Sequence, residues 1–583
     1  MSVIEQAAPS AAANTGALTD TEREHFDSLI AELQAGEMAW AAVSLADRAE
    51  LLMRVHASVA ASAEDWALTA AALKGMDQSS PLVGEEWMSG PYSMLTGLLT
   101  VAGSLQSLAA LRNPLDGLTF GTAPGDRITV PIMPASTFEG MLMNGFTAEV
   151  WMPPGVDGET IRAGVGLASR RTDQTHGVGL VLGAGNITSI APLDVLYELI
   201  ANNRVALLKL NPTMAAMEPV YAKALAPLIQ LGVLRIVQGG SEAGSYLVRH
   251  PGIAHVHITG SAATHDAIVY GSGKQGRANK QAGIPTLEKP ITSELGGVSP
   301  IIVVPGDWTN ADLAFQAEHA ATMRLHNGGY NCIAGQVVIL SSDWPQKDAF
   351  LAELRLVMDT APGRTAWYPG SDDRMNTARA SYPDAVALGP GGARLLIDAS
   401  ASAEVMESTE YFSPVLGVVE LAGTGQAFLD AAVATSNEKL VGTLGANVII
   451  DPTERKRLGA GFREAIARLR YGSIAINAWT GVIFLTAAAT WGAFPGHTLE
   501  DVQSGRGVVH NGLLLDGPER TVLTGPFRPF PRSVRHGENA LMPKPPWFIT
   551  ARSAAMTGRR LTEFAAKPGW RRIPAVFAAA FKA

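Results

Sequence analysis

Hydrophobic and polar positions alternate between residues 177 and 340 in a pattern that predicts strands separated by helices. The apolar runs GVGLVL, RVALLKL, LRIVQG and HVHITG have the length and composition of buried strands. The spacing of apolar residues between these runs predicts helices over residues 192–201, 214–231 and 243–249. PIIVVP and AGQVVIL begin a second series of the same kind. The pattern therefore predicts βαβ units and an α/β fold with mainly parallel sheets.

The regions before this part of the chain have different patterns. Residues 20–112 carry apolar residues at helical spacing, beginning with Phe26, Leu29, Ile30 and Leu33. Thr19 or Asp20 is the candidate N-cap of the first helix. Residues 114–160 are rich in glycine and proline and contain two β-like runs, RITVPIM and GFTAEVWM. We therefore expect a helical segment followed by short strands.

One uncharged stretch, residues 471–496, is long enough to span a membrane. It contains Ser473, Asn477 and several threonines and glycines, and Pro495 interrupts its end. Polar and helix-breaking residues at these positions favour a buried strand, loop and strand over a membrane helix.

Composition narrows the class of protein. The chain has 583 residues, enough for several domains, and its net charge of −9 gives no indication of nucleic-acid binding. A single cysteine excludes an intrachain disulfide and favours a reducing compartment, so we expect a cytoplasmic protein. Residues 1–18 do not have the pattern of a signal peptide and are expected to be a flexible lead-in. The sequence has no HxxxH or CxxC pair, so we expect no metal site.

The C-terminal segment, residues 531–583, differs from the acidic remainder of the chain. It holds ten Lys and Arg residues but two Asp and Glu residues. Its aromatic residues include Trp547, Phe548, Trp570, Phe577 and Phe581. Two interpretations remain open. The segment docks on the acidic body or on a sister subunit, or its basic and aromatic residues contact a membrane surface.

Three segments carry candidate chemistry. LGAGN at 182–186 follows a strand but lacks the third glycine of a dinucleotide-binding motif, so a tight turn also explains it. Cys332 follows two glycines and an asparagine just before a predicted strand, where a thiol is accessible and can be activated. A lone cysteine is otherwise a small buried hydrophobic residue. Glu294 in SELGGVSP is either a solvated capping residue or a general base.

Taken together, eight motifs occur in the order found in one enzyme family, and the chain resembles the aldehyde dehydrogenase superfamily over about residues 20–530. The cysteine follows the glutamate by 38 residues, a separation similar to that in the family. The motifs are GAGNITS around Asn186, LLKLNP with Lys209, GGSEAGSYL at 239–247, ITGS with Ser261, SELGG with Glu294, NGGYNCIA with Cys332, EYFSPV with Glu410 and Phe412, and YGSIAIN at 471–477.

The resemblance implies an α/β architecture with two parallel-sheet domains, a Rossmann-like cofactor domain and a catalytic domain, and a small β oligomerisation arm. The implied cofactor domain comprises 19–124 and 151–292, and the catalytic domain 293–505. The arm comprises 125–150 with 506–530, and 531–583 is a basic extension. The resemblance also implies a homodimer or homotetramer.

The resemblance further implies roles for particular residues. Cys332 would attack an aldehyde and give a thiohemiacetal and then a thioester, with Asn186 and the Cys332 backbone N–H stabilising the oxyanion. Glu294 would activate the water that hydrolyses the thioester to a carboxylic acid. NAD or NADP would accept the hydride. The residues that would bind this cofactor are Lys209, Gly240, Gly244, Ser261, Glu410 and Phe412.

Five positions depart from the family pattern: Tyr330 replaces a glutamine, Val337 an arginine, Val298 a lysine, His265 a glycine and Pro212 a glutamate. The missing carboxylate at position 212 lessens the repulsion of a 2′-phosphate, so NAD and NADP both remain open.

Two alternative functions remain. A CoA-acylating aldehyde dehydrogenase would transfer the acyl group to CoA, although such members often lack the residue that corresponds to Glu294. A non-catalytic scaffold or membrane-associated homologue would fit the altered surroundings of Cys332 and the basic tail. The substrate is also open, because the aromatic residues Trp479, Phe484, Trp491 and Phe494 either line an apolar tunnel or belong to the core.

Overall fold

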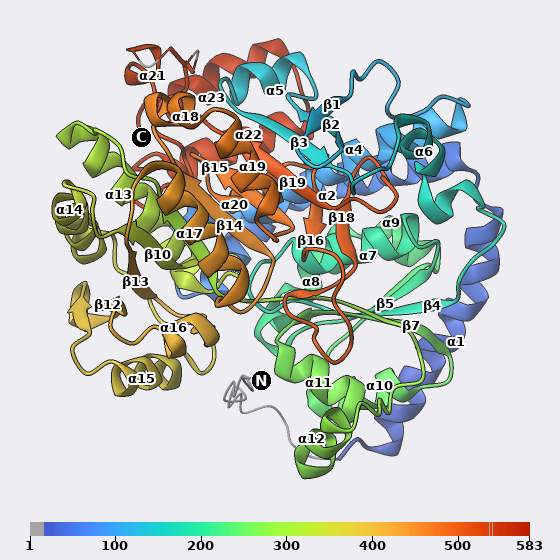
Figure 1. Cartoon of the computed structure of the whole chain (residues 1–583). Coiled ribbons are helices and arrows are strands. Elements are labelled where there is room, and N and C mark those ends of the chain that lie inside the picture. Colours follow the sequence, from blue (N-terminus) through green and yellow to red (C-terminus); the bar gives the residue numbers. More distant parts are fainter. Residues whose placement is uncertain (1–16, 536, 539) are drawn as a thin grey trace.

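The computed structural model describes residues 17–535, 537–538 and 540–583, and in it the chain builds two large sheets covered by helices (Figure 1). Most of the predicted lead-in, residues 1–16, lies outside the described residues. Each large sheet contains a run of parallel strands connected through helices. This architecture confirms the predicted α/β class.

The N-terminal helices form the first layer. Thr19 caps the first of them, since its hydroxyl accepts from the backbone N–H of Glu22 and the Glu22 carboxylate accepts from the backbone N–H of Thr19. Phe26, Ile30 and Leu33 are buried on this helix, as their spacing predicts. The helices of this layer are α1 (Asp20–Ala42), α2 (Leu45–Leu73), α3 (Val83–Trp87), the π-helical turn η1 (Met88–Tyr92) and α4 (Ser93–Ala109).

The smaller of the two sheets has six strands in the order β17-β8-β7-β4-β5-β6. All neighbouring pairs are parallel except β17 with β8. The carboxyl ends of the parallel strands therefore meet at one edge, where α/β sheets bind ligands. The strands are β4 (Val178–Leu182), β5 (Val205–Lys209), β6 (Leu234–Val237), β7 (Ile253–Gly260), β8 (Ile291–Leu295) and β17 (Gly505–Arg506). The connecting helices include α7 (Ile190–Ile200), α10 (Ser241–Arg249), α11 (Ala262–Tyr270) and α12 (Gly273–Gln281).

The larger sheet has eleven strands in the order β1-β2-β3-β19-β15-β14-β9-β10-β13-β12-β11. Its strands are β1 (Gly121–Ala123), β2 (Arg127–Met133), β3 (Thr147–Trp151), β9 (Ser299–Val303), β10 (Gly335–Ser341), β11 (Val386–Leu388), β12 (Arg394–Asp398), β13 (Val415–Leu421), β14 (Gly445–Ile449), β15 (Ser473–Ile476) and β19 (Arg520–Thr524). Its helices and the short ones nearby are α5 (Thr137–Leu142), α6 (Gly158–Gly164), α13 (Asn310–Leu325), α14 (Lys347–Thr360), α15 (Ser371–Ser381), α16 (Glu404–Ser408), α17 (Gly425–Glu438), α18 (Pro452–Leu458), α19 (Ala460–Arg468) and α20 (Thr480–Leu485).

The two segments assigned to an arm contribute β2, β3 and β19 to this larger sheet. β3 pairs antiparallel with β19, with Val150 opposite Thr521, and β19 in turn pairs parallel with β15. The strands assigned to the arm therefore belong to the same hydrogen-bonded sheet as the parallel strands of this chain. The expected boundary at residue 293 falls within β8, which belongs to the smaller sheet.

Two predicted elements differ from the structure. The helix expected over 214–231 is divided into η3 (Pro212–Met217), α8 (Glu218–Ala224) and α9 (Ala226–Gln230). Pro219 and Pro227 lie in the first turns of α8 and α9, because proline lacks an N–H and clashes with a preceding helical turn. The loop expected within 471–496 contains α20, between β15 and β16 (Thr490–Gly492), which pairs with β18 (Val508–Asn511). No helix of the described residues is long and apolar enough to cross a membrane.

The C-terminal segment packs on the body of its own chain. Figure 1 shows its helices, in red, beside α5. Trp547 and Phe548 are buried, and Phe548 stacks on Phe315 with ring centroids 5.2 Å apart. Arg559 forms an ion pair of 3.2 Å with Glu64. The helices of the segment are α21 (Arg532–Arg535), α22 (Ala554–Ala566) and α23 (Ile573–Ala580).

One close approach fixes the position of α22. A Cβ atom on Gly84 would lie 2.4 Å from the carbonyl carbon of Ala554, so α3 and α22 meet with no room for a side chain there. The first of the two interpretations, docking on the acidic body, therefore describes the placement of this segment.

We predict that the segment stabilises the fold. Phe548→Ala is expected to lower the free energy of unfolding by about 3–5 kcal/mol, because it leaves a cavity beside Phe315 and His319. Denaturant unfolding followed by tryptophan fluorescence measures this change. Phe581→Ala is the matched control, since Phe581 is 56% exposed and its loss should change stability by less than about 0.5 kcal/mol. Equal effects of the two variants would contradict a structural role for the segment.

Candidate active site

Cys332 lies on the loop that joins α13 to β10. The loop begins with three residues in the left-handed region, Asn327, Gly328 and Gly329, at φ values of 55°, 70° and 82°. A Cβ atom on Gly329 would lie 2.9 Å from the backbone of Ser413, so glycine is required there on two grounds. The turn presents Cys332, which is half-buried, to a cavity of about 540 Å³.

Asn327 joins this loop to the rest of the molecule. Its side-chain N–H groups donate to the carbonyl oxygens of Asn186 at 3.2 Å and Tyr330 at 3.1 Å. Its side-chain oxygen accepts from the Lys74 ammonium at 3.0 Å, and its backbone N–H donates to Glu85 at 3.0 Å. The loop after β4, the cysteine loop and the N-terminal helices therefore meet at one side chain.

The charged residues around Asn327 were missed in the sequence. Lys74 and Glu86 are fully buried and pair at 2.9 Å, and Arg364 pairs with Glu85. A buried lysine requires such partners, because an isolated charge is strongly disfavoured in the protein interior. The available signal was the acidic pair in the apolar run LVGEEWM, since adjacent carboxylates in a buried helix need cations.

Asn186 lies in the loop after β4 and lines the same cavity as Cys332. Its amide nitrogen donates to the carbonyl oxygen of Tyr330 at 2.9 Å, two residues before Cys332 in the chain. This bond fixes the position of the side chain, which carries a second N–H. The structure therefore places the Asn186 amide beside the cysteine loop, bonded to the backbone of Tyr330.

Glu294 lies on β8, and its carboxylate lies beside the Cys332 thiol. The indole N–H of Trp491 donates to its carboxylate at 3.3 Å. Burial raises the pKa of Glu294 to about 7, and the buried Asp194 carboxylate also raises this pKa. Burial, followed by the charge of the adjacent Glu294, raises the pKa of Cys332 above its usual range. The two groups therefore disfavour being ionised together.

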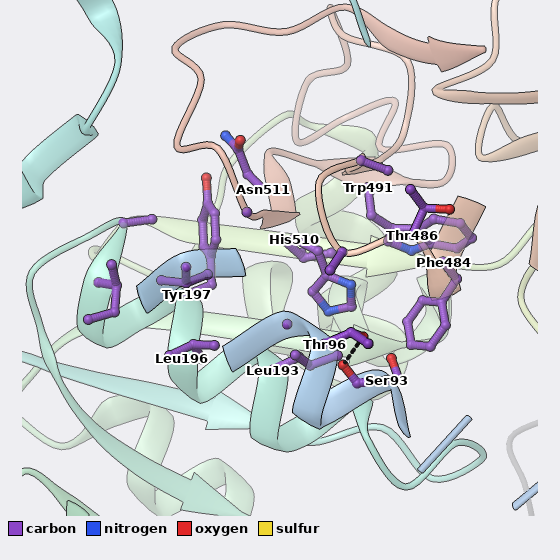
Figure 2. A pocket seen from close by; sticks show the side chains of 18 of the residues that line it. Ser93, Thr96, Leu193, Leu196, Tyr197, Phe484, Thr486, Trp491, His510 and Asn511 are labelled. Carbon is purple, nitrogen blue, oxygen red and sulfur yellow. Dashed lines mark hydrogen bonds between the residues drawn. The ribbon is translucent and has the colours of Figure 1, made fainter. Parts of the chain in front are cut away.

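A buried polar network surrounds Asp194 behind Trp491. The Thr259 hydroxyl donates to Asp194 at 3.0 Å, and the imidazoles of His257 and His510 lie 3.5 and 3.6 Å from its carboxylate. His510 also lines a cavity of about 560 Å³ between α4 and α7. Figure 2 shows its ring in this cavity, near Phe484 and the helix that carries Leu193. Within this network Asp194 adds to the effect of burial in raising the pKa of Glu294, whereas His257 lowers this pKa.

A second carboxylate, Glu410, is half-buried beside the glycines that follow Glu294. A Cβ atom on Gly296 would lie 2.0 Å from a carboxylate oxygen of Glu410, so only glycine allows this approach. Burial raises the pKa of Glu410 to about 7. Phe412, at φ 42°, directs its ring toward Tyr368, with centroids 4.9 Å apart. Of these two candidate cofactor residues, Glu410 lies beside the SELGG motif and Phe412 lies beside the aromatic residues near the cysteine loop.

The remaining candidate cofactor residues follow strands of the six-stranded sheet. Lys209 ends β5, and burial lowers the pKa of its ammonium to about 8. Gly240 is the N-cap of α10, which follows β6, and a Cβ atom on Gly244 in that helix would meet no other atom. Ser261 caps α11 after β7, accepting from the backbone N–H of Thr264 at 3.2 Å. Because these strands are parallel, the topology brings the residues to one edge.

Four of the five positions that depart from the family pattern are buried, and Pro212 is exposed. Tyr330 stacks on Tyr368 at 5.5 Å between centroids, and its hydroxyl lies 2.8 Å from that of Ser371. Val298 and Val337 are core residues, and His265 is fully buried on α11. The large aromatic at 330 thus fills space beside the cysteine loop with a cluster of rings.

Three of the four aromatic residues proposed for an apolar tunnel line the Cys332 cavity, and the fourth does not. Trp479, Phe484 and Trp491 line the Cys332 cavity, and Trp479 and Trp491 also belong to the core cluster of the larger sheet. Phe494 lies elsewhere, beneath the Arg520 guanidinium, 4.8 Å from its ring centroid. The cavity is therefore mainly apolar around the thiol. Among the described residues no group of three or more His, Cys, Asp or Glu side chains is arranged to hold a metal ion.

Comparison with known proteins agrees with the motifs. Residues 150–364 match the model of the aldehyde dehydrogenase family. Among solved structures, an NAD-dependent aldehyde dehydrogenase from Sinorhizobium meliloti is 18% identical, with a TM-score of 0.58 over 87% of this chain and 88% of that chain.

Two further structures have the same fold. Gamma-glutamyl-gamma-aminobutyraldehyde dehydrogenase from Burkholderia cenocepacia is 20% identical, with a TM-score of 0.56 over 85% of this chain and 88% of that chain. A mutant of aldehyde dehydrogenase C from Pseudomonas syringae, in complex with NAD+ and octanal, is 18% identical, with a TM-score of 0.57 over 87% and 90%. Residues 150–364 thus resemble the aldehyde dehydrogenase family, and the chain shares the fold of these solved aldehyde dehydrogenases.

Proposed function

We propose that the protein oxidises an aldehyde to a carboxylic acid with NAD or NADP, through a thiohemiacetal and a thioester on Cys332. The observation that carries this proposal is that Cys332 and Asn186 line one cavity and that Glu294 lies close enough to Cys332 to raise the pKa of the thiol. The presence of a buried carboxylate favours hydrolysis over transfer of the acyl group to CoA. The same three residues argue against a non-catalytic scaffold.

The first covalent step joins the Cys332 sulfur to the aldehyde carbon. The thiol proton must leave, and Glu294, with a pKa of about 7, is the neighbouring base that can accept it. The negative charge that develops on the aldehyde oxygen needs donors already in place. The second N–H of the Asn186 amide and the backbone N–H of Cys332 are the proposed donors, and the bond from Asn186 to Tyr330 holds the amide in position.

Glu294 then serves the hydrolytic step. A base with a pKa near neutrality is half-ionised at physiological pH, so it can take a proton from water and later release it. The indole of Trp491 orients the carboxylate by its hydrogen bond. Water attack on the thioester releases the carboxylic acid and restores the Cys332 thiol.

The carboxyl edge of the six-stranded sheet suits a nicotinamide dinucleotide. Burial alone lowers the pKa of Lys209, so a polar partner at this edge would favour its charged form. Ser261 caps a helix whose N-terminus favours anions such as a pyrophosphate. When bound, NAD or NADP supplies the hydride acceptor. Pro212, which begins η3, provides no carboxylate to exclude a 2′-phosphate, so we propose that either cofactor is accepted.

We predict that Cys332→Ser abolishes aldehyde-dependent reduction of NAD and NADP, because a serine hydroxyl beside Glu294 is a far weaker nucleophile than a thiol. Absorbance of the reduced cofactor measures turnover across short, aromatic and long-chain aldehydes. The wild-type protein should need no CoA. If product formation requires CoA, the protein is a CoA-acylating enzyme and the proposed hydrolysis is wrong. If neither cofactor is reduced with any aldehyde, the result favours the non-catalytic scaffold.

We predict that Glu294→Gln slows deacylation by about 10²–10⁴-fold and leaves hydride transfer faster than hydrolysis. An acyl adduct on Cys332 should then accumulate, measured by mass spectrometry of the intact protein. In the wild type, deacylation should rise with pH and reach half its maximum near pH 7, because the ionised carboxylate is the active form. Glu407→Gln is the matched control, since burial also raises the pKa of Glu407 and this residue is none of the candidate catalytic or cofactor residues. Loss of the hydride-transfer burst in Glu294→Gln would mean that Glu294 is required to accept the thiol proton, and it would contradict a requirement confined to the hydrolytic step.

We further propose that the protein is a homodimer or homotetramer, since β1 leaves an unpaired edge on the larger sheet. Contact of the C-terminal segment with a membrane surface is a separate proposal, supported by Trp570 at 60% and Phe581 at 56% exposure beside basic residues. Sedimentation velocity should give a dimer or tetramer. Flotation with anionic vesicles should recover the wild type, and the double variant Trp570→Ser with Phe581→Ser should remain unbound. A monomer, or equal flotation of both proteins, would overturn the respective proposal.

A further inference from the structure

A large apolar cavity lies beside the Cys332 cavity, beneath the C-terminal segment. Its volume is about 1070 Å³. The arm region contributes Phe146, helix α13 contributes Phe315, and the C-terminal segment contributes residues from Met542 to Phe548 and from α22 and α23. Segments far apart in the sequence thus enclose a space that the proposed chemistry at Cys332 does not use.

The two cavities share a wall. Met88, Leu485 and Trp547 line both of them. Met88 begins the π-helical turn η1, where Pro91 interrupts the helix, and π-helical turns are frequent at functional sites. Methionine has three rotatable bonds and adapts its shape, and Leu485 is only partly buried. The wall between the thiol and the larger cavity is therefore made of side chains that can move.

The lining of the larger cavity indicates what it can hold. His319 is buried, which lowers its pKa to about 3, so the imidazole is neutral, and it stacks on Phe548 at 5.2 Å. Glu139 is half-buried on α5 and is the one carboxylate of the lining. An apolar chain would be favoured here, and a chain that ends in an anion would be repelled by Glu139.

The cavity of Figure 2 is the competing space. It also adjoins the Cys332 cavity, through Phe484 and Trp491. It is about half the size, at about 560 Å³, and it presents His510, Asn511 and Tyr197 (Figure 2). Asn511 is already paired with Leu515, and His510 lies 3.6 Å from Asp194, so these polar groups do not exclude an apolar chain. The larger cavity is the better candidate for a long aliphatic chain because of its volume.

We propose that the cavity beneath the C-terminal segment binds the tail of the aldehyde substrate, which is a long, unbranched aliphatic chain without an anionic end. This inference rests on the proposed function. The aldehyde carbon reaches Cys332, and the tail passes Met88, Leu485 and Trp547. The C-terminal segment, far in sequence from the catalytic residues, is then part of the substrate site.

The test compares straight-chain aldehydes from propanal to dodecanal. For the wild type, kcat/KM should rise about fourfold for each methylene group that the cavity holds, which corresponds to about 0.8 kcal/mol. Ala580→Phe places a ring in the cavity from α23 and should lower kcat/KM for dodecanal by about tenfold or more. It should leave propanal within about twofold of wild type, which also shows that the variant is folded. Leu561→Trp, from α22, is the second plug.

Controls separate the possible outcomes. Ala578→Phe alters an exposed position of the same helix and should change neither substrate. Thr96→Phe fills the cavity of Figure 2, and a selective loss of dodecanal in this variant would move the tail there. Equal kcat/KM for all chain lengths in the wild type would overturn the tail site and leave the proposed function intact.

A direct binding measurement tests the cavity even if the protein oxidises no aldehyde. Dodecanol binding by calorimetry should weaken in Ala580→Phe and not in Ala578→Phe, whether or not any aldehyde is oxidised. If no aldehyde is oxidised, this result keeps the apolar site and removes the proposed function. If dodecanol does not bind the wild-type protein, the site is refuted independently of activity.

Discussion

The hydrogen bond between the buried Lys74 ammonium and the Asn327 side chain is the contact on which the active-site geometry depends. Asn327 takes the left-handed conformation that turns the cysteine loop, and the same side chain holds the backbones of Asn186 and Tyr330. The N-terminal helices therefore position both the nucleophile and the proposed oxyanion donor. Loss of one partner of a buried charge typically costs about 3–5 kcal/mol, because the other charge remains in a medium of low dielectric constant. Such a network tolerates little change in any of its members.

The electrostatics of the site follow from burial. Glu294 and Glu410 both have a pKa of about 7, and burial is the largest cause for each. The Glu294 carboxylate raises the pKa of Cys332, whereas the hydrogen bond from the Cys332 thiol lowers the pKa of Glu294. The pair therefore favours a protonated thiol beside an ionised carboxylate, and the thiolate is the reactive form. Ionisation of the thiol and neutralisation of the glutamate are then one coupled event, which links nucleophile formation to the base needed later.

The sequence predicts what local pattern controls and misses what depends on distant contacts. Apolar runs such as GVGLVL identify buried strands because a parallel sheet covered on both faces needs them, and β4 is where this run predicts it. Cys332, Glu294 and Asn186 are found by motif order, and they line or adjoin one cavity. Pro219 and Pro227 indicate where the expected helix is divided. The prediction of one helix follows the helical spacing of the apolar residues and gives these prolines too little weight. Lys74 and Glu86 could not be paired from sequence, because only the packing of α2 against α3 brings their charges together.

The C-terminal segment shows most clearly why composition alone misleads. Its excess of basic residues describes the outer surface, where Arg559 meets Glu64, whereas its buried side is apolar and includes Trp547 and Phe548. Charge counts cannot separate these two sides, because they do not record direction. Trp547 lines both the Cys332 cavity and the larger apolar cavity, so the extension contributes a side chain to the cavity that holds the proposed nucleophile. The extension is therefore a structural part of the proposed substrate site, because it completes the apolar wall on which the shape of that site depends.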